Sequence, residues 1–277
     1  MTIGNLSKLD EILSRYQSLF SEELGEYKGP KARILIDSAE PPRFCKVMSV
    51  LYALRQQVAD QLKLLESEGI LKPVDHVGWA APMVPVIKPD KSIRICGDFK
   101  YTISRATRMN KYPISQVEDL LARLAKGKYF TKLDLSQAYN QLLLPEKSQQ
   151  YTTINTFRGL LQYTRLPFGI SSAPSMFQRV LESVLQGTND TDNYLDDILI
   201  ATETETEHVE QLDAVLRRLS KAGFHLRRDK CTFMATSVSY LGHNTTLTVK
   251  EFIQTGRKCK RSEMPQLQLI VKNYAAF

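Results

Sequence analysis

NYLDDILIAT, residues 193–202, places two adjacent carboxylates between residues that favour burial. The pattern predicts a β-hairpin in which Tyr194 and Leu195 enter, Asp196 and Asp197 form the turn, and residues 198–201 leave. Asp-Asp is a poor turn pair, because two-residue hairpin loops prefer Asn-Gly or Asp-Gly and because like charges repel. Such a departure from local rules is typical of a functional site, where a divalent cation relieves the repulsion. A plain surface turn is the alternative reading.

The composition sets broad limits on the class of protein. The 277 residues are 43% hydrophobic, which is enough for a core and for one or two domains. The formal net charge of +7 suits a polyanionic partner such as nucleic acid, although many other proteins share such a balance. The four cysteines form no C-x-x-C pair, which indicates reduced thiols. No signal peptide or membrane span is recognisable, so we expect a cytoplasmic or nuclear protein without a membrane partner.

Helical and strand patterns alternate without a regular βαβ repeat. Helical spacing of apolar residues predicts helices over 51–69, 115–127, 171–187 and 206–223. Apolar and β-branched runs predict strands within 79–99, 129–135 and 193–201. This mixture favours an α+β fold over a doubly wound parallel sheet.

A third carboxylate strengthens the functional reading of the Asp pair. Asp134 lies near the end of the apolar run YFTKLDL, residues 129–135, and the chain between it and Asp196 is long enough to return beside that strand. Carboxylates at adjoining strand ends could hold two Mg²⁺ ions about 3.5–4 Å apart, which is the arrangement used for two-metal phosphoryl chemistry. The sequence therefore predicts in-line displacement at phosphorus.

Five ordered segments resemble the reverse transcriptases of gypsy-type LTR retrotransposons. They are KLDLSQAYNQLLL (132–144), LPFGISSAPSMFQRVL (166–181), YLDDILIAT (194–202), AGFHLRRDKC (222–231) and SYLGH (239–243). The stretch 71–99 is similar to the fingers region of those enzymes, and the resemblance extends over roughly residues 20–243. It implies a right-hand polymerase fold of class α+β, with fingers and palm subdomains and an antiparallel palm sheet packed on helices. After residue 243 the sequence departs from the family pattern, so we expect a thumb that is missing or rudimentary.

The resemblance also implies a domain organisation. Residues 1–75 form a helical and extended region leading into the fingers, 76–245 form the fingers–palm domain, and 246–277 form a divergent basic tail. The chain is then expected to be a truncated portion of a pol polyprotein that lacks the RNase H domain.

Catalytic roles follow from the same resemblance. Asp134, Asp196 and Asp197 correspond to the catalytic, metal-binding aspartates. The backbone of Leu135 corresponds to a contact with the incoming triphosphate and is included among the metal ligands. Lys230 corresponds to the lysine that protonates the departing pyrophosphate, as an ammonium beside a developing anion can do.

Further positions correspond to contacts with nucleotide, primer and template. The nucleotide-binding candidates are Lys88, Arg94, Tyr139, Phe168 and Gly169. Arg94 would grip the triphosphate bidentately with Lys88 beside it, although Lys91 competes with Lys88 for that position. Tyr139 would lie under the deoxyribose. The primer and template candidates are Tyr194, Leu241, Gly242 and His243.

The resemblance thus implies an RNA-directed DNA polymerase, a nucleotidyltransferase that extends the 3′-OH of a primer. Its partners would be a primed RNA or DNA template and dNTP substrates, and its cofactor two Mg²⁺ ions, with Mn²⁺ as a possible substitute. The alternative is a catalytically inactive nucleic-acid-binding relic without thumb and RNase H domains. The sequence leaves the oligomeric state open.

Overall fold

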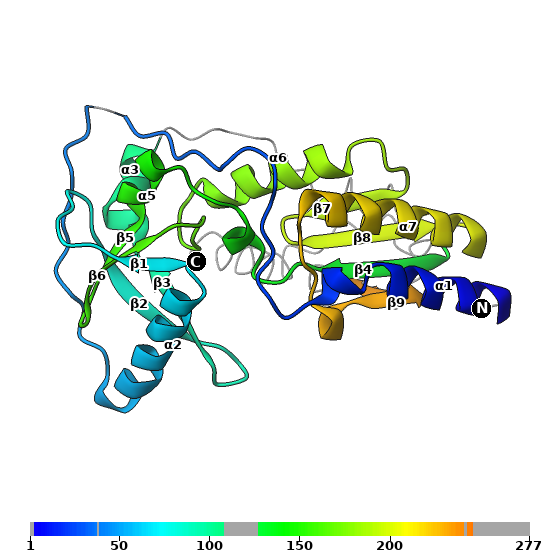
Figure 1. Cartoon of the computed structure of the whole chain (residues 1–277), viewed down its shortest axis with the longest axis horizontal. Helices are drawn as coiled ribbons and strands as arrows, with labels where there is room; N and C mark the ends of the chain where they lie inside the picture. The colour runs from blue at the N-terminus through cyan, green and yellow to red at the C-terminus, as the bar shows by residue number, and fades with distance from the viewer. Residues whose placement is uncertain (1–2, 38, 108–126, 241–242, 246–277) are drawn as a thin grey trace, which may run out of the picture. The chain divides into compact units, whose positions relative to one another are not determined.

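The computed structural model describes residues 3–37, 39–107, 127–240 and 243–245. These residues form two compact units, each made from segments that are far apart in the sequence (Figure 1). The four-stranded unit contains the described parts of 1–28, 112–138 and 177–265, and the five-stranded unit contains those of 29–111 and 139–176. Because the chain passes several times between the units, neither core is built from one continuous stretch.

The four-stranded unit is built on a sheet of order β7-β8-β4-β9 in which all neighbours are antiparallel. Its strands are β4 (Tyr129–Asp134), β7 (Thr191–Tyr194), β8 (Asp197–Thr202) and β9 (Thr232–Ala235). A bulge between Phe130 and Lys132 interrupts the pairing of β4 with β9. Strand β4 therefore occupies an interior position, and its last residue, Asp134, is flanked by chain on both sides.

Helices cover one face of this sheet. They are α1 (Ile3–Arg15), α6 (Ala173–Leu185), which enters from the five-stranded unit, and α7 (Glu205–Ala222), with the 3₁₀ turns η1 (Gln17–Phe20) and η6 (Arg228–Lys230). Figure 1 shows α7 and α1 running along the sheet. A capping box between Thr204 and Glu207 begins α7, and Gly223, at φ 81°, ends it. Its buried apolar residues recur at helical spacing: Val209, Leu212, Val215, Leu216 and Leu219.

The two faces of β4 have different neighbours, since side chains alternate along a strand. Thr131 faces α7, where its hydroxyl is hydrogen-bonded to Nε2 of His208 at 2.7 Å. Phe130, Lys132 and Asp134 share the opposite face. There Phe130 packs in an apolar cluster with Leu199 and Ala201, and Tyr194 and Val238 pack against it. Val238 begins β10 (Val238–Tyr240), which pairs with β11 (His243–Thr245).

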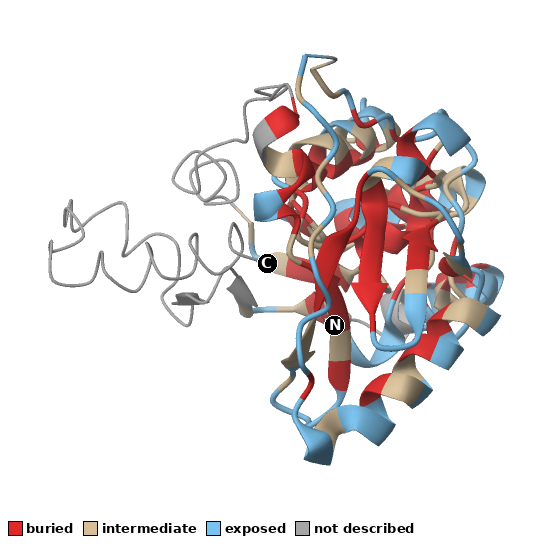
Figure 2. Cartoon of the chain, turned by 90° about the vertical axis from the view of Figure 1, so that its left-hand side faces the viewer, coloured by how far each residue is buried: buried red, intermediate tan, exposed pale blue. Residues whose placement is uncertain are grey.

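The five-stranded unit has a mixed sheet of order β1-β6-β5-β2-β3. Its strands are β1 (Leu71–Pro73), β2 (Ala81–Ile87), β3 (Ile93–Gly97), β5 (Thr153–Thr156) and β6 (Gly159–Tyr163). Only the β2–β5 pair is parallel among these described pairings. Figure 2 shows buried residues concentrated in strands and exposed residues on the outer sides of helices.

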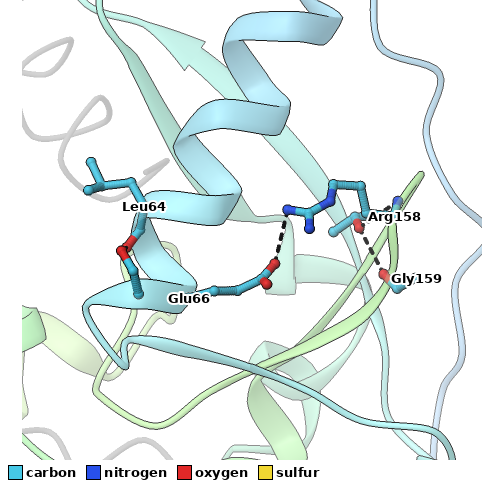
Figure 3. A network of polar contacts seen from close by, with 6 residues as sticks. Leu64, Glu66, Arg158 and Gly159 are labelled. Atoms are coloured by element: carbon cyan, nitrogen blue, oxygen red, sulfur yellow. Dashed lines mark hydrogen bonds and ion pairs between the residues drawn. The ribbon is translucent and has the colours of Figure 1, made fainter.

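Short helices surround this second sheet. They are α2 (Arg55–Ser67), α3 (Ile103–Ala106), α5 (Glu146–Gln149) and the 3₁₀ turns η2 (Tyr52–Leu54), η3 (Phe99–Tyr101), η4 (Ala138–Gln141) and η5 (Gln150–Thr152). Helix α2 buries Val58, Leu62 and Leu65. Its Glu66 also binds Arg158 in the β5–β6 turn at 3.1 Å, which joins that turn to α2 (Figure 3).

The helices predicted from the sequence can be compared with those of the structure. The helix expected over 51–69 is shorter, because α2 begins only at Arg55 and Leu51 is exposed before it. The helix expected over 115–127 lies outside the described residues, except for its last position, and so does the tail 246–277. Among the helices that the structure describes, none is long and apolar enough to cross a bilayer.

Candidate active site

Asp134 and Asp197 lie directly opposite each other on adjacent antiparallel strands. Strand β4 ends at Asp134 and β8 begins at Asp197, so both carboxylates stand at the same end of the sheet. Directly opposed residues in an antiparallel pair have Cα atoms about 4.5–5.5 Å apart and side chains on the same face. The strand register thus brings together two carboxylates that the sequence separates widely.

Asp196 occupies the two-residue turn between β7 and β8, beside Leu195. The expected turn pair Asp196-Asp197 is wrong by one residue, because Tyr194 pairs with Asp197 and Asp197 is already in β8. The physical reason is that Leu195 takes the positive φ, 56°, at the first loop position, as type II′ turns require. A non-glycine residue in this region costs roughly 1–2 kcal/mol, so other contacts must hold the turn.

Gln178 on α6 holds this turn. Its Oε1 accepts the backbone N–H of Leu195 at 2.7 Å, and its Nε2 donates to the backbone carbonyl of Asn193 at 3.0 Å. Gln178 is 1% exposed and Leu195 is 5% exposed. A buried amide that satisfies two backbone groups of the turn offsets its strain and fixes the position of Asp196.

Burial and mutual repulsion disfavour the charged forms of these acids. The pKa of Asp196 is raised to about 6, first by burial and then by the carboxylate of Asp197. The pKa of Asp134 is raised mainly by burial, against the lowering influence of the Lys230 ammonium. A bound cation would therefore stabilise the ionised acids, and such perturbed carboxylates are typical of functional sites.

The segment 227–231, which lies beside β4 on the side away from β8, fixes the backbone of Asp134 and places Lys230 near it. The backbone N–H of Asp134 donates to Sγ of Cys231 at 3.5 Å, and its carbonyl accepts from Arg227 N at 2.9 Å. Lys230 lies between these two in η6, close enough to lower the pKa of Asp134. The turn η6 and the residues that flank it, directly before β9, thus supply both a backbone clamp and a cation.

Leu135 is 3% exposed and forms an isolated antiparallel bridge with Leu226. The hydrogen bonds of that bridge use the carbonyl of Asp134 and the N–H of Ser136. The N–H and C=O groups of Leu135 itself therefore take no part in these hydrogen bonds and point away from Leu226.

The carboxylates of Asp134, Asp196 and Asp197 are chemically suited to bind a hard divalent cation. Carboxylate oxygens are the ligands that Mg²⁺ prefers, and register and turn place three of them at one end of the sheet. In the described conformation, however, no three His, Cys, Asp or Glu side chains of the described residues are grouped as a complete metal site. Oδ2 of Asp197 is instead 3.0 Å from Nζ of Lys132. Our sequence reasoning missed Lys132, although its position two residues before Asp134 on a strand already implies a shared face.

The nucleotide-binding candidates lie in the five-stranded unit, where three of them form one stack. The guanidinium of Arg94 on β3 lies 4.7 Å from the ring centre of Phe168, and that ring centre lies 4.8 Å from the ring centre of Tyr139. Three separate segments contribute to this cluster, which we call the Arg94 stack. Cation–π and ring contacts of this kind hold a guanidinium in a defined orientation.

Gly169, which follows Phe168, lies at a position where a side chain would not fit. Its φ is 92°, and a Cβ at this position would lie 2.6 Å from the backbone oxygen of Gly97. Only glycine fits such a close approach of two chain segments. Gly169 therefore keeps the Phe168 segment against the end of β3.

Register separates the two candidate lysines of the β2–β3 turn. Val86 pairs with Arg94, and the backbone N–H of Lys88 donates to Ser92 at 2.9 Å, so Lys88 lies on the same face as Arg94. Lys91 is exposed in the loop and has a positive φ of 65°. The geometry therefore favours Lys88 as the neighbour of Arg94.

The primer and template candidates are only partly described. Tyr194 ends β7 opposite Asp197, and burial raises its pKa. Leu241 and Gly242 lie outside the described residues. For His243 the structure describes the backbone, which begins β11.

Residues 86–245 match the family described as reverse transcriptase (RNA-dependent DNA polymerase). An uncharacterized protein of Caenorhabditis elegans, K02A2.6, is 32% identical over 85% of this chain and 19% of its own length. The retrovirus-related Pol polyprotein from transposon gypsy of Drosophila melanogaster is 33% identical over 73% of this chain and 20% of its own length. The corresponding polyprotein from transposon opus is 30% identical over 88% and 25%. The chain thus spans about a fifth to a quarter of the curated relatives that it matches.

Solved structures of foamy virus protease–reverse transcriptase have the same fold. The prototype foamy virus CSH mutant gives a TM-score of 0.80 at 24% identity and covers 88% of this chain and 33% of that chain. The foamy viral enzyme in complex with an RNA/DNA hybrid gives a TM-score of 0.80 at 22% identity and covers 98% and 38%. The likeness confirms the α+β fingers–palm fold that the sequence motifs predicted, with its antiparallel sheet packed on helices.

Proposed function

The chain belongs to the reverse transcriptase family, and from this we propose that it carries the nucleotidyl-transfer centre of an RNA-directed DNA polymerase. Residues 76–245 would form the polymerase portion, with 1–75 leading into it and 246–277 as a basic extension. The observation that carries the proposal is the register of β4 and β8, which sets Asp134 against Asp197 with Asp196 in the adjoining turn.

Asp134, Asp196 and Asp197, with the backbone of Leu135, would hold two Mg²⁺ ions, for which Mn²⁺ can substitute. When bound, these ions supply a more acidic primer hydroxyl and neutralise charge on the reacting phosphate. The reaction would be an in-line attack by the primer 3′-OH on the α-phosphorus of a dNTP, with pyrophosphate as the leaving group. The chain's own task is to hold the carboxylates in place, which it does through Gln178 and through the backbone clamp on Asp134.

Lys230 would act on the leaving group. Its ammonium would donate a proton to a pyrophosphate oxygen as the bond to the α-phosphorus breaks. The 3₁₀ turn η6 carries Lys230 directly beyond Arg227, whose backbone N–H is bound to Asp134. This connection supports a fixed relation between the proton donor and the acids.

The Arg94 stack would bind the nucleotide. The guanidinium of Arg94 can hold phosphate oxygens bidentately, and Phe168 beneath it restricts its orientation. Lys88 shares the face of Arg94 and would add a second cation to the same phosphates. Tyr139, which packs on Phe168, would lie under the deoxyribose and exclude a 2′-OH, and Gly169 would keep this segment close to β3.

A primed RNA or DNA template would be the macromolecular partner. Tyr194, Leu241, Gly242 and His243 would contact the primer terminus and the template. The positive net charge supports binding through phosphates, independent of sequence and weakened by salt. A protein of the same fold has been solved with an RNA/DNA hybrid, which supports the same class of partner.

Primer extension with the full chain tests the proposal. Wild type, Asp196→Asn and Asp10→Asn are compared on poly(rA)·oligo(dT) with dTTP and Mg²⁺, the last being a matched change at an exposed carboxylate on α1. The proposal expects extension by wild type and by Asp10→Asn, and none by Asp196→Asn. Equal extension by all three, or none by any with nucleic-acid binding retained in a gel shift, would instead support the non-catalytic binding protein.

A further inference from the structure

Lys132 lies on β4 among the acidic residues of the candidate active site. It is two residues before Asp134, and it pairs with Leu199, which is two residues after Asp197 on β8. Lys132 and Asp197 are therefore diagonal neighbours on one face of the sheet, a separation that a long side chain can bridge. The register alone thus directs the lysine toward the carboxylates.

The contact between Lys132 and Asp197 is direct and largely shielded from water. Nζ of Lys132 lies 3.0 Å from Oδ2 of Asp197, and the two side chains are 22% and 21% exposed. An ion pair at this depth is screened less than a surface pair and holds both groups more firmly. Burial raises the pKa values of Asp134 and Asp196, and the Lys132 ammonium opposes this rise, so its charge acts on all three acids.

Asp197 is paired with Lys132 in the described conformation. The three acids stand at one end of the sheet, yet no group of three metal-binding side chains is assembled among the described residues, and Asp197 is bound to Lys132. An ammonium and a divalent cation are both attracted to the same carboxylate. They cannot both lie at salt-bridge distance from one oxygen without strong repulsion between them.

We propose that Lys132 is an internal counter-ion that holds Asp197 when no divalent cation is bound and that must release it when the cation binds. Lys132 is then a positioning residue: it keeps the three acids from repelling one another in the free protein and sets the affinity of the site for metal. This inference rests on the proposed metal site. It adds that one of the ligands is exchanged between a lysine and the cation.

Two measurements that need no catalytic activity test this exchange. Binding of Mn²⁺ to the full chain is followed by the loss of the free-ion electron paramagnetic resonance signal, for wild type, Lys132→Met, Lys128→Met and Asp197→Asn. Lys128 is exposed just before β4, so Lys128→Met removes the same charge without breaking the ion pair. The exchange predicts that Lys132→Met binds Mn²⁺ about tenfold more tightly, since a full positive charge beside a ligand is lost, whereas Lys128→Met binds as wild type does.

The second measurement uses the wild-type chain and remains informative if Lys132→Met does not fold. Acylation of lysines by acetic anhydride is quantified by mass spectrometry with and without Mn²⁺, with Lys128 as the internal reference. Release from Asp197 predicts faster acylation of Lys132 when Mn²⁺ is present. Unchanged or slower acylation of Lys132 at saturating Mn²⁺ overturns the exchange and leaves the proposed function standing.

Failure of the proposed function has a different signature. If wild type and Asp197→Asn bind Mn²⁺ equally, or if neither binds it, the carboxylates are not the metal site and both proposals fall. If Asp197→Asn weakens binding while Lys132→Met has no effect on it, only the role of Lys132 is refuted.

Discussion

Gln178 and Leu195 form a hydrogen bond of 2.7 Å that connects α6 to the turn carrying Asp196. The bond is buried, and a second bond from Gln178 to Asn193 makes the contact bidentate. Leu195 is in the left-handed region of φ. One side-chain amide thus holds a strained turn at the point where two acids must be positioned.

We expect Gln178→Leu to destabilise the fold and to reduce catalysis further than the loss of stability explains. Removing the amide leaves a buried N–H and a buried carbonyl without their partner, which costs about 1–3 kcal/mol for each group. Urea unfolding and primer extension measure the two effects. Gln56→Leu, at an exposed helix position, is the matched control. A Gln178→Leu chain with wild-type activity would contradict a positioning role.

Asp196→Asn should stabilise the free protein at neutral pH. The folded-state pKa of Asp196 is about 6 against an ordinary value of 3.8, so its contribution is fully present below pH 3.8 and is lost as the pH rises through 6. The neutral amide avoids this loss. In urea unfolding with a chelator, we expect a gain of about 1–3 kcal/mol at pH 7.5 and little gain at pH 4. Equal stability of both chains at pH 7.5 would contradict the raised pKa that burial and the neighbouring Asp197 give Asp196.

His208 should make the fold sensitive to acid. It is fully buried between Thr131 and Thr202, and burial lowers its pKa to about 4 from an ordinary 6.5. A base with a depressed folded-state pKa stays neutral in the fold while the unfolded chain takes up a proton. Its contribution to stability is therefore present above pH 6.5 and is lost as the pH falls toward 4.

The loss between these pH values should approach about 3 kcal/mol. It is measured as the slope of unfolding free energy against pH in wild type and in His208→Gln, with His76→Gln as an exposed control. We expect a shallower slope only in His208→Gln. The same slope in all three chains would show that His208 does not titrate in this range.

The sequence predicted the places of the acids along the strands better than the geometry of the turn between those strands. The apolar strand before Asp134 and the strand after Asp197 lie where the pattern put them, and both acids are at strand ends. The turn was misplaced by one residue, because propensity disfavours Leu at a positive φ and the compensating bonds come from Gln178, which is distant in the sequence.

Residue contacts that depend on register could not be read from the sequence. The ion pair of Lys132 with Asp197 requires the alignment of β4 with β8, and the Arg94 stack requires three separate segments to meet. The family resemblance supplied the identities of Arg94, Tyr139 and Phe168, but not their stacking. The division into two discontinuous units likewise arises from tertiary contacts alone.

Gly169→Ala should weaken both the fold and nucleotide binding. A methyl group here would meet the Gly97 oxygen at 2.6 Å in addition to the positive φ. Gly159→Ala has a positive φ of 108° but open space around the added carbon, so it isolates the cost of backbone strain. We expect Gly169→Ala to lose at least about 1 kcal/mol more than Gly159→Ala in urea unfolding. We also expect only Gly169→Ala to raise the KM for dTTP. Equal effects of the two substitutions would refute the close-approach argument.

The central claim is that Asp134 and the Asp196-Asp197 pair form one nucleotidyl-transfer centre. Its most direct test is single-nucleotide incorporation of dTTP on poly(rA)·oligo(dT) by wild type and Asp134→Asn, with circular dichroism to show that both are folded. Because Asp134 comes from a different strand than the pair, its loss tests the convergence itself. We predict incorporation by wild type and a loss of at least about a hundredfold in Asp134→Asn. Incorporation at the wild-type rate by a folded Asp134→Asn chain would contradict the account.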